Sequence, residues 1–492
     1  MKEDLTKAVR VRFAPSPTGN LHIGGVRTAL FNYIFALKYN GKFILRIDDT
    51  DKVRSKKEYE DSIQNDLQWF EINWSEFYRQ SERTLIYEKH LSDLKEKGLV
   101  YECFCTEDEI LKSKEIAIKS KRPYIYNGRC TNLSAEEKEK LSLSFKQKGL
   151  YPSIRLNVAQ VLRINPRFNS IEFNDAVHGH LSFNPKIIGD FILKTEDNRF
   201  AYNFASIIDD YDIGITHVIR GEDHISNTPK QILILNALDK KPPVFAHISL
   251  LYGKDGKIMS KRDASSNIKY YKEEGYLPEA VLNYLAVTGN TFSSYEYKDG
   301  KEQIFEKEIF SNILEMSDFF EIKKAKGSSA IFNEDKLRHI NEKHLNIMPA
   351  VQFIKVLTEK FQGGYILEKL KKEYGEVISL EILDFLKNEF KTVKEILREL
   401  ELFFEDYKIN LEGVKYDSLL KQSLLNNLLN TEDFSENSIK NIIKKTSLIS
   451  NNSVKECYET LRLLITGKLD GPSILKLIKF LGKGIVIKRL SV

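Results

Sequence analysis

The chain has 492 residues, of which 42% are hydrophobic and 29% charged, with 75 lysines and arginines against 70 acidic residues. This length is too great for one compact core and predicts roughly three to five domains. The composition is that of an ordinary globular protein and argues against a membrane span, because no stretch approaches the ~18 consecutive apolar residues that a span needs.

The first ten residues mix charged side chains with apolar ones ahead of any apolar run, which is not the layout of a signal peptide. Four cysteines in a chain of this length do not form a disulfide framework. We therefore expect a cytoplasmic protein that does not bind membranes.

Short apolar runs alternate with helical stretches over the first part of the chain. Residues 9–13 and 43–47 have strand-like composition, and residues 24–39 between them place apolar side chains at helical spacing. Residues 213–219 are a third strand candidate, and a helix is expected at 228–238. Strands that alternate with helices predict an α/β fold with a Rossmann-type, doubly wound parallel sheet.

The run from Arg12 to Gly25 joins the first strand to the first helix. It reads Arg-Phe-Ala-Pro-Ser-Pro-Thr-Gly and then Leu-His-Ile-Gly-Gly after one asparagine. Glycines permit close approach of a ligand to the backbone, and the unpaired N–H groups of a helix N-terminus attract phosphate. A histidine such as His22 before a glycine turn is usually structural, but the whole run is far more specific for a triphosphate site.

This run resembles the His-Ile-Gly-His signature of the class I aminoacyl-tRNA synthetases, and its Pro-Ser-Pro-Thr-Gly lead-in resembles that of the glutamyl enzymes. Gly25 stands where the second histidine of the signature would be, and glutamyl enzymes commonly have a small or polar residue there. The resemblance implies that ATP, with Mg²⁺, binds at Gly19, His22, Gly24 and Gly25, and that His22 is catalytic.

The segment Arg46-Ile-Asp-Asp-Thr-Asp51 follows the second strand. It resembles the glutamyl Arg-Ile-Glu-Asp-Thr-Asp motif, in which the first acidic residue binds the α-amino group of the substrate. The resemblance gives this role to Asp48, which is one methylene shorter than glutamate. It also adds Ala14 and Ser16 to the glutamate site. An acidic turn that caps a helix is the alternative interpretation, and both can hold together.

Residues 103–194 are expected to form an α+β insertion into the nucleotide-binding sheet. Cys103, Cys105 and Cys130 lie within it, and three thiolates in one region favour zinc over unliganded cysteines, although both remain open. Some glutamyl enzymes bind structural Zn²⁺ with a Cys-x-Cys, Tyr-x-x-x-Cys arrangement, which this chain resembles with Tyr126 as the fourth ligand.

Two later stretches, residues 201–206 and 218–224, complete the resemblance. They imply that Tyr202 lines the substrate pocket and that Arg220 faces a substrate carboxylate. Arginine suits this role because its planar guanidinium binds a carboxylate through two hydrogen bonds. Glutamate has two carboxylates, and we expect Arg12 on the side-chain carboxylate and Arg220 on the α-carboxylate, although the sequence does not fix which is which.

A basic loop follows at residues 255–262, with the sequence Asp-Gly-Lys-Ile-Met-Ser-Lys-Arg. Basic residues on a glycine-containing loop are usually just exposed charge. Together with the first motif, however, this loop resembles the Lys-Met-Ser-Lys-Ser signature that closes over ATP in class I enzymes. The resemblance implies ATP contacts from Ser260, Lys261 and Arg262, with Lys261 catalytic.

The chain after Ala264 is expected to be predominantly helical, with all-α C-terminal domains. Residues 336–492 hold 26 lysines and arginines against 21 acidic residues, so the whole positive excess lies there. A surface for nucleic acid phosphates and ordinary solvated helix faces both fit this charge. The expected domains are a catalytic domain (1–102 with 195–255), an insertion that holds the tRNA acceptor end (103–194), a stem-contact domain with the basic loop (256–335) and a helical anticodon-binding region (336–492).

A helical C-terminal region resembles that of the bacterial-type glutamyl enzymes, whereas glutaminyl and eukaryotic-type glutamyl enzymes have β-barrels there. The implied partners are L-glutamate, ATP and tRNA-Glu, and the implied state is a monomer. Enzymes strict for tRNA-Glu often have an arginine before a phenylalanine where this chain has Glu389 before Phe390. This difference hints that tRNA-Gln is charged as well.

Two other functions fit part of this sequence less well. A pantothenate-synthetase-like ligase shares the class I sheet but lacks a large helical C-terminal region. A tRNA-binding relative without catalytic activity would not be expected to retain His22, Lys261, Arg12 and Arg220 together.

Overall fold

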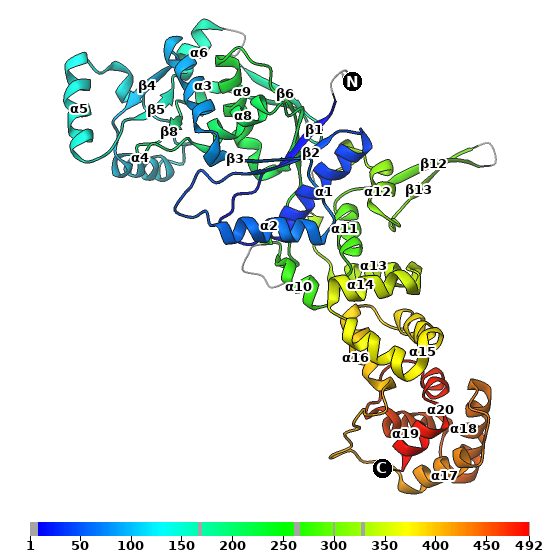
Figure 1. Ribbon diagram of the computed structural model, residues 1–492. Coiled ribbons are helices and arrows are strands. Elements are labelled where there is room, and N and C mark those ends of the chain that lie inside the picture. Colours follow the sequence, from blue (N-terminus) through cyan, green and yellow to red (C-terminus); the bar gives the residue numbers. More distant parts are fainter. Residues whose placement is uncertain (1–7, 166–169, 260–265, 299–300, 326–329, 492) are drawn as a thin grey trace. The chain divides into compact units, whose positions relative to one another are not determined.

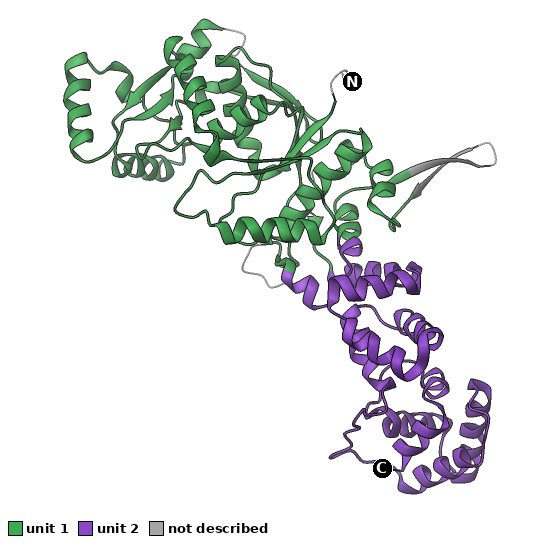
Figure 2. Cartoon of the chain, viewed as in Figure 1, with its two compact units in different colours: residues 1–268, 282–333 green, residues 269–281, 334–492 purple. Residues whose placement is uncertain are grey.

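The computed structural model describes residues 8–165, 170–259, 266–298, 301–325 and 330–491, with the backbone alone for 294–298 and 301–305 (Figure 1). The chain divides into two compact units (Figure 2), the first made of residues 1–268 and 282–333 and the second of residues 269–281 and 334–492. Within the described ranges, every helix is too short or too polar to cross a lipid bilayer.

Parallel strands form the centre of the first unit. Strands β1 (Arg10–Phe13), β2 (Lys42–Ile47) and β3 (Glu76–Arg79) pair in the order β1-β2-β3, and β9 (His217–Gly221) pairs with β10 (Val244–Ile248). The strands β1, β2, β9 and β10 are buried over most of their length, as parallel strands covered by helices on both faces usually are. The predicted parallel-sheet fold is therefore confirmed.

Helices connect and cover these strands. They are α1 (Ile23–Lys38), α2 (Lys57–Trp69), α3 (Thr84–Glu96), α8 (Tyr202–Asp212) and α9 (Thr228–Ala237). The helices expected at 24–39 and 228–238 correspond to α1 and α9. The strand expected at 213–219 begins only at His217, because Ile213 is the C-cap of α8 and Gly214 turns the chain with a φ of 75°.

An antiparallel region interrupts the parallel sheet. Strands β4 (Val100–Cys103), β5 (Ser153–Leu156) and β8 (Ile192–Lys194) form one sheet, and β6 (Ile171–Asp175) and β7 (Gly179–Phe183) form a hairpin. The accompanying helices are α4 (Glu107–Lys119), α5 (Ala135–Gln147), α6 (Val158–Ile164) and α7 (Pro185–Ile188). Capping boxes begin α4 at Thr106 and α5 at Ser134, which explains where both helices start.

The region after Ala264 is predominantly helical, as predicted, but residues 268–331 also contain strands. This region contains helices α10 (Ile268–Glu273), α11 (Pro278–Val287) and α12 (Ile313–Phe319), and the antiparallel hairpin β12 (Ser293–Lys298) and β13 (Lys301–Glu306) lies between α11 and α12. The short strands β11 (Leu251–Tyr252) and β14 (Ala330–Ile331) also pair. Asp-Gly, the sequence at 299–300, is common in hairpin turns and is the local signal that favours this hairpin.

Helices alone make up residues 334–491 of the second unit, as predicted. They are α13 (Glu334–Ile347), α14 (Ala350–Phe361), α15 (Gly364–Lys387), α16 (Val393–Leu400), α17 (Ser418–Leu429), α18 (Glu436–Ser450), α19 (Val454–Thr466) and α20 (Ile474–Leu490). Residues 380–402, whose apolar side chains recur at helical spacing, are divided between α15 and α16, because Thr392 leaves the helical conformation and caps α16 in a capping box with Glu395.

Candidate functional site

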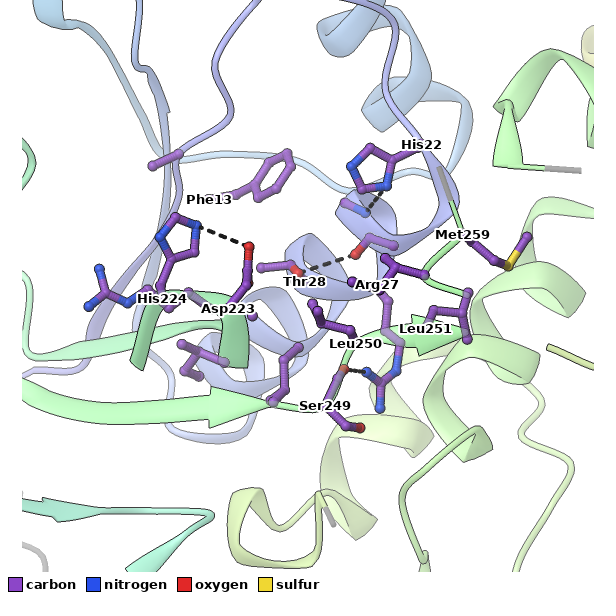
Figure 3. Close-up of a pocket in the computed structure, with 18 of the residues that line it drawn as sticks. Phe13, His22, Arg27, Thr28, Asp223, His224, Ser249, Leu250, Leu251 and Met259 are labelled. Atoms are coloured by element: carbon purple, nitrogen blue, oxygen red, sulfur yellow. Dashed lines mark hydrogen bonds and ion pairs between the residues drawn. The ribbon is translucent and has the colours of Figure 1, made fainter. Parts of the chain in front are cut away.

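An open cleft lies at the carboxyl ends of the parallel strands of the first unit, where ligands of doubly wound sheets usually bind. Its walls come from β1, the start of α1, the segment after β9 and the segment after β10 (Figure 3). The predicted residues that line it are Arg12, Ala14, His22, Gly24, Gly25, Tyr202 and Arg220. Residues from three distant parts of the sequence therefore meet in one place.

His22 is the N-cap of α1, and its Nδ1 accepts a hydrogen bond from the backbone N–H of Gly25 at 3.1 Å. A neutral ring whose Nδ1 accepts carries its proton on Nε2, so Nε2 can act as a donor. The first turn of α1 contains no acidic residue, and a Cβ on Gly25 would lie 2.8 Å from Leu21 Cδ1. A small residue, a helix N-terminus and an N–H donor together suit an anionic ligand.

Arg220 is buried, with 4% of its surface exposed. Its Nε donates to His247 Nε2 at 3.2 Å, and its Nη2 donates to Thr228 Oγ1 and to Gln231 Oε1, both at 2.8 Å. Among the described residues, Nη1 has no hydrogen-bond partner and Arg220 forms no ion pair. Because burying an uncompensated charge is costly, and burial lowers the pKa of Arg220, this guanidinium is prepared for an anion.

Arg12 differs from Arg220 in having a carboxylate partner. Its Nε and Nη2 donate to the two oxygens of Asp210 at 3.0 and 3.3 Å, and both side chains are buried. Burial opposes ionisation of Asp210, but Arg12 and Arg46 hold its pKa below the ordinary value. Arg12 thus reaches the cleft with its orientation fixed and much of its charge offset.

Asp48 lies beside this ion-pair network rather than on the cleft wall. Arg46 donates to both of its oxygens, at 2.7 and 3.2 Å, and also to Asp210 at 2.7 Å. Burial raises the pKa of Asp48 to about 6 in spite of Arg46. Ser16 and Gly19 likewise are not among the residues that line the cleft.

Lys261, Ser260 and Arg262 lie outside the described residues. The described residues on either side of that segment do reach the cleft: Ile258 and Met259 line it, and Asn267 forms an antiparallel β-bridge with His22. Figure 3 shows Met259 on the segment next to the helix that His22 begins.

Sequence reasoning missed several residues of the cleft. Asp223 and His224 follow Arg220 within a motif already singled out, and the ring of His224 lies 5.4 Å from that of Tyr202. Burial, together with nearby Arg220 and Arg12, lowers the pKa of His224 to about 4, so it is neutral near pH 7. The buried Arg27 donates to the backbone oxygens of Ser249 and Thr288, which only the fold brings near it.

The three clustered cysteines and Tyr126 do meet in the antiparallel region. The Sγ atoms of Cys103, Cys105 and Cys130 lie within 4.8 Å of one another, and Cys105 and Cys130 are 3.8 Å apart. Tyr126 Oη lies 3.5 Å from Cys103 Sγ and 3.3 Å from Cys105 Sγ. Tetrahedral zinc with bonds of about 2.3 Å to sulfur separates its sulfur ligands by about 3.8 Å, so these donors fit that ion.

Comparison with known proteins gives matches along the whole chain. Residues 8–339 match the family model of class I tRNA synthetases (E and Q), catalytic domain, and residues 352–492 match an anticodon binding domain. A glutamate–tRNA ligase of Hydrogenobaculum sp. is 38% identical over 496 residues, covering 98% of this chain and 99% of the relative. That of Aquifex aeolicus is 39% identical over 495 residues, covering 98% of each.

A solved structure agrees with these sequence matches. The crystal structure of a glutamate tRNA ligase from Elizabethkingia meningosepticum, described as in complex with its amino acid, is 30% identical. It superposes with a TM-score of 0.77 and covers 99% of both chains.

Proposed function

Since the chain belongs to the glutamate–tRNA ligases, a family of class I aminoacyl-tRNA synthetases, we propose that the cleft of the first unit is where it activates L-glutamate with ATP. The observation that carries this proposal is the buried Arg220, which has an unpaired Nη1 and no carboxylate partner among the described residues. A substrate carboxylate would supply the missing charge and hydrogen-bond acceptor.

Two arginines suit an amino acid with two carboxylates. In this proposal Arg12 takes the side-chain carboxylate and Arg220 the α-carboxylate, with Tyr202 beside them. Ala14, which lines the cleft just after β1, and Ser16, two residues further on, are assigned to the same glutamate site. The α-ammonium group is assigned to Asp48, whose ion pair with Arg46 orients its carboxylate.

Activation then joins the α-carboxylate to the α-phosphorus of ATP and releases pyrophosphate. The attacking group is already an anion, so no general base is required, and the protein contributes orientation and positive charge. We assign the phosphates to His22 Nε2, the N–H group of Gly24, the close backbone approach that Gly25 allows, the turn at Gly19 and the loop residues Ser260, Lys261 and Arg262. Mg²⁺ bound with ATP would offset further negative charge on the phosphates.

Transfer places the activated glutamate on the 3′-terminal adenosine of tRNA. We propose that residues 103–194 hold the acceptor end, that 256–335 contact the stem and that 336–492 bind the anticodon. The match of residues 352–492 to an anticodon binding domain supports the last of these. We also propose a cytoplasmic monomer, and structural Zn²⁺ held by Cys103, Cys105, Tyr126 and Cys130.

Charging of purified tRNA-Glu and tRNA-Gln with labelled glutamate tests the proposal. We expect glutamate to be attached to tRNA-Glu in an ATP-dependent reaction, and labelled glutamine not to be attached. Lys261→Ala should retain the fold and glutamate binding but lose activity by about 10²- to 10³-fold, as removal of one transition-state contact typically does. Near wild-type pyrophosphate exchange by that variant, with tRNA present, would contradict the role of Lys261.

A further inference from the structure

We propose that Asp175 and His247 are positioning residues for glutamate binding, and that they act by holding Arg220 through a neutral acceptor. The inference rests on the proposed function, in which Arg220 binds a substrate carboxylate. It adds two residues that do not line the cleft and that come from the hairpin β6–β7 and from β10.

The contact between Asp175 and His247 is fully buried. The Oδ2 atom of Asp175 lies 2.6 Å from His247 Nδ1, and the carboxylate also accepts from the backbone N–H of His247 at 3.2 Å. Both side chains have 0% of their surface exposed. The hairpin is anchored here by a backbone bond from Ala176 to Phe245 at 2.8 Å, so Asp175 is presented to β10 in a fixed place.

These contacts fix the tautomer of the imidazole. Burial opposes ionisation of Asp175, but hydrogen bonds from His247 and from the turn after β6 hold its pKa below the ordinary value, so Asp175 is an anion and Nδ1 of His247 must carry a proton. Arg220 Nε can only donate, and therefore Nε2 of His247 must accept. His247 is neutral in this arrangement, in agreement with the lowering of its pKa by burial and by Arg220.

A neutral acceptor has a specific consequence for Arg220. A carboxylate at the position of His247 would orient the guanidinium equally well but would offset its charge, as Asp210 does for Arg12. The imidazole, Thr228 and Gln231 fix Nε and Nη2 without an ion pair, which leaves the positive charge for the ligand. The preorganised fork then loses little entropy when a carboxylate binds.

A purely structural role for the pair is the competing explanation, because Asp175 also accepts from the backbone N–H groups of Val177 and His178, both at 2.9 Å. The two explanations differ in what they affect. Loss of stability would weaken the binding of glutamate and ATP alike, whereas misplacement of Arg220 would weaken the binding of glutamate and leave that of ATP unchanged.

The test is glutamate-dependent pyrophosphate exchange by the full chain with tRNA present, in which KM is measured separately for glutamate and for ATP. Asp175→Asn can donate to His247 Nδ1 and so shift the ring proton to Nε2, where it would face the Nε–H of Arg220. His247→Asn removes the acceptor, whereas His247→Gln offers an amide oxygen near the position of Nε2.

We expect Asp175→Asn and His247→Asn to raise the KM for glutamate at least about tenfold, the scale of a lost hydrogen bond to a charged group, with the KM for ATP and the melting temperature nearly unchanged. His247→Gln should lie closer to wild type. Asp239→Asn makes the same change as Asp175→Asn at a carboxylate that is 80% exposed and outside the cleft, and this matched control should behave as wild type.

An unchanged KM for glutamate in Asp175→Asn and His247→Asn would overturn the proposal. A parallel rise of the KM values for glutamate and ATP would also overturn it. So would failure of Asp175→Asn, His247→Asn and His247→Gln to fold, because either result means that the pair serves stability alone. A wild-type chain without glutamate-dependent exchange would instead contradict the proposed function, which separates the two failures.

Discussion

At the scale of single residues, the two arginines of the cleft differ in whether a carboxylate of the protein is bound to them. Arg12 has Asp210 and Arg220 has only neutral partners among the described residues. The sequence motifs identify both arginines but cannot reveal this difference, because Asp210 reaches Arg12, and His247 reaches Arg220, only through the packing of separate segments. It is therefore the fold, rather than the local motif, that leaves Arg220 without a carboxylate partner among the described residues.

Substitution of Arg220 by lysine tests this difference directly. Lysine keeps the charge but loses the planar fork, and it cannot reach Thr228, Gln231 and a ligand together. We expect Arg220→Lys to raise the KM for glutamate in pyrophosphate exchange by about 10- to 100-fold, as for one or two lost charged hydrogen bonds. Arg54→Lys, whose side chain is 73% exposed, is the control, and equal behaviour of the two variants would refute the assignment.

At the scale of helices and strands, local sequence signals predicted the sheet and its first helix because buried parallel strands and amphipathic helices have distinct periodicities. The ends of strands and the positions of turns depend on single residues, and these were harder to predict. The strand at His217 starts late because a helix cap precedes it, and the hairpin β12–β13 was missed although its turn sequence is favourable. The cysteine cluster was predicted as a group, since its members lie close together in the sequence.

Measurement of bound metal tests whether the cysteine cluster holds zinc. We expect roughly one zinc per chain in protein purified without chelator, measured by inductively coupled plasma mass spectrometry, because the donor set fits a tetrahedral ion. Cys130→Ser should lose most of the metal and lower the melting temperature, since structural zinc contributes to folding. Cys457→Ser, a buried cysteine of α19, is the matched control. Much less than one zinc per wild-type chain would defeat the prediction.

Helix α13 carries one buried and one exposed histidine, which allows a matched test of pH dependence. Burial lowers the pKa of His344 to about 4 from 6.5, so the folded state resists its protonation. The unfolded chain binds this proton first, and the stabilisation that is complete above pH 6.5 is therefore lost as the pH falls towards 4.

The expected loss from His344 is about 1 kcal/mol between pH 7.5 and pH 5.5. Urea unfolding of the second unit, followed by hydrogen exchange of α13 peptides, should show this pH dependence in wild type and in His339→Gln, whose side chain is 58% exposed. His344→Gln should show a smaller pH dependence, whatever its absolute stability. An equal slope in all three proteins would exclude His344 as the cause.

At the scale of the whole molecule, the match to an anticodon binding domain lies in the second unit, whereas the cleft lies in the first. The second unit consists largely of helices, and residues 352–492 match an anticodon binding domain. Its helical architecture was predictable from periodic apolar positions, whereas the nucleotides it reads are not encoded in that periodicity. A single exposed side chain at the end of a helix can nevertheless change such a preference.

We propose that Glu389 has this role. It is exposed just after α15, in the segment that leads to α16. Its carboxylate interacts electrostatically with Arg462 of α19 and partly opposes the lowering of the Arg462 pKa by burial. A carboxylate near a phosphate or a base acceptor repels it, whereas arginine donates to both. We expect wild type to charge tRNA-Gln as well as tRNA-Glu, and Glu389→Arg to lower the ratio of tRNA-Gln to tRNA-Glu charging about tenfold, which corresponds to ~1.4 kcal/mol.

The ratio of kcat/KM for the two purified tRNAs, with labelled glutamate, measures this preference. Glu376→Arg makes the same charge change at an exposed position of the same helix and should leave the ratio unaltered. Pyrophosphate exchange should be equal in both variants, because the cleft proposed for glutamate and ATP lies in the first unit. A wild-type chain that charges only tRNA-Glu, or two variants with the same ratio, would show that Glu389 does not set tRNA choice.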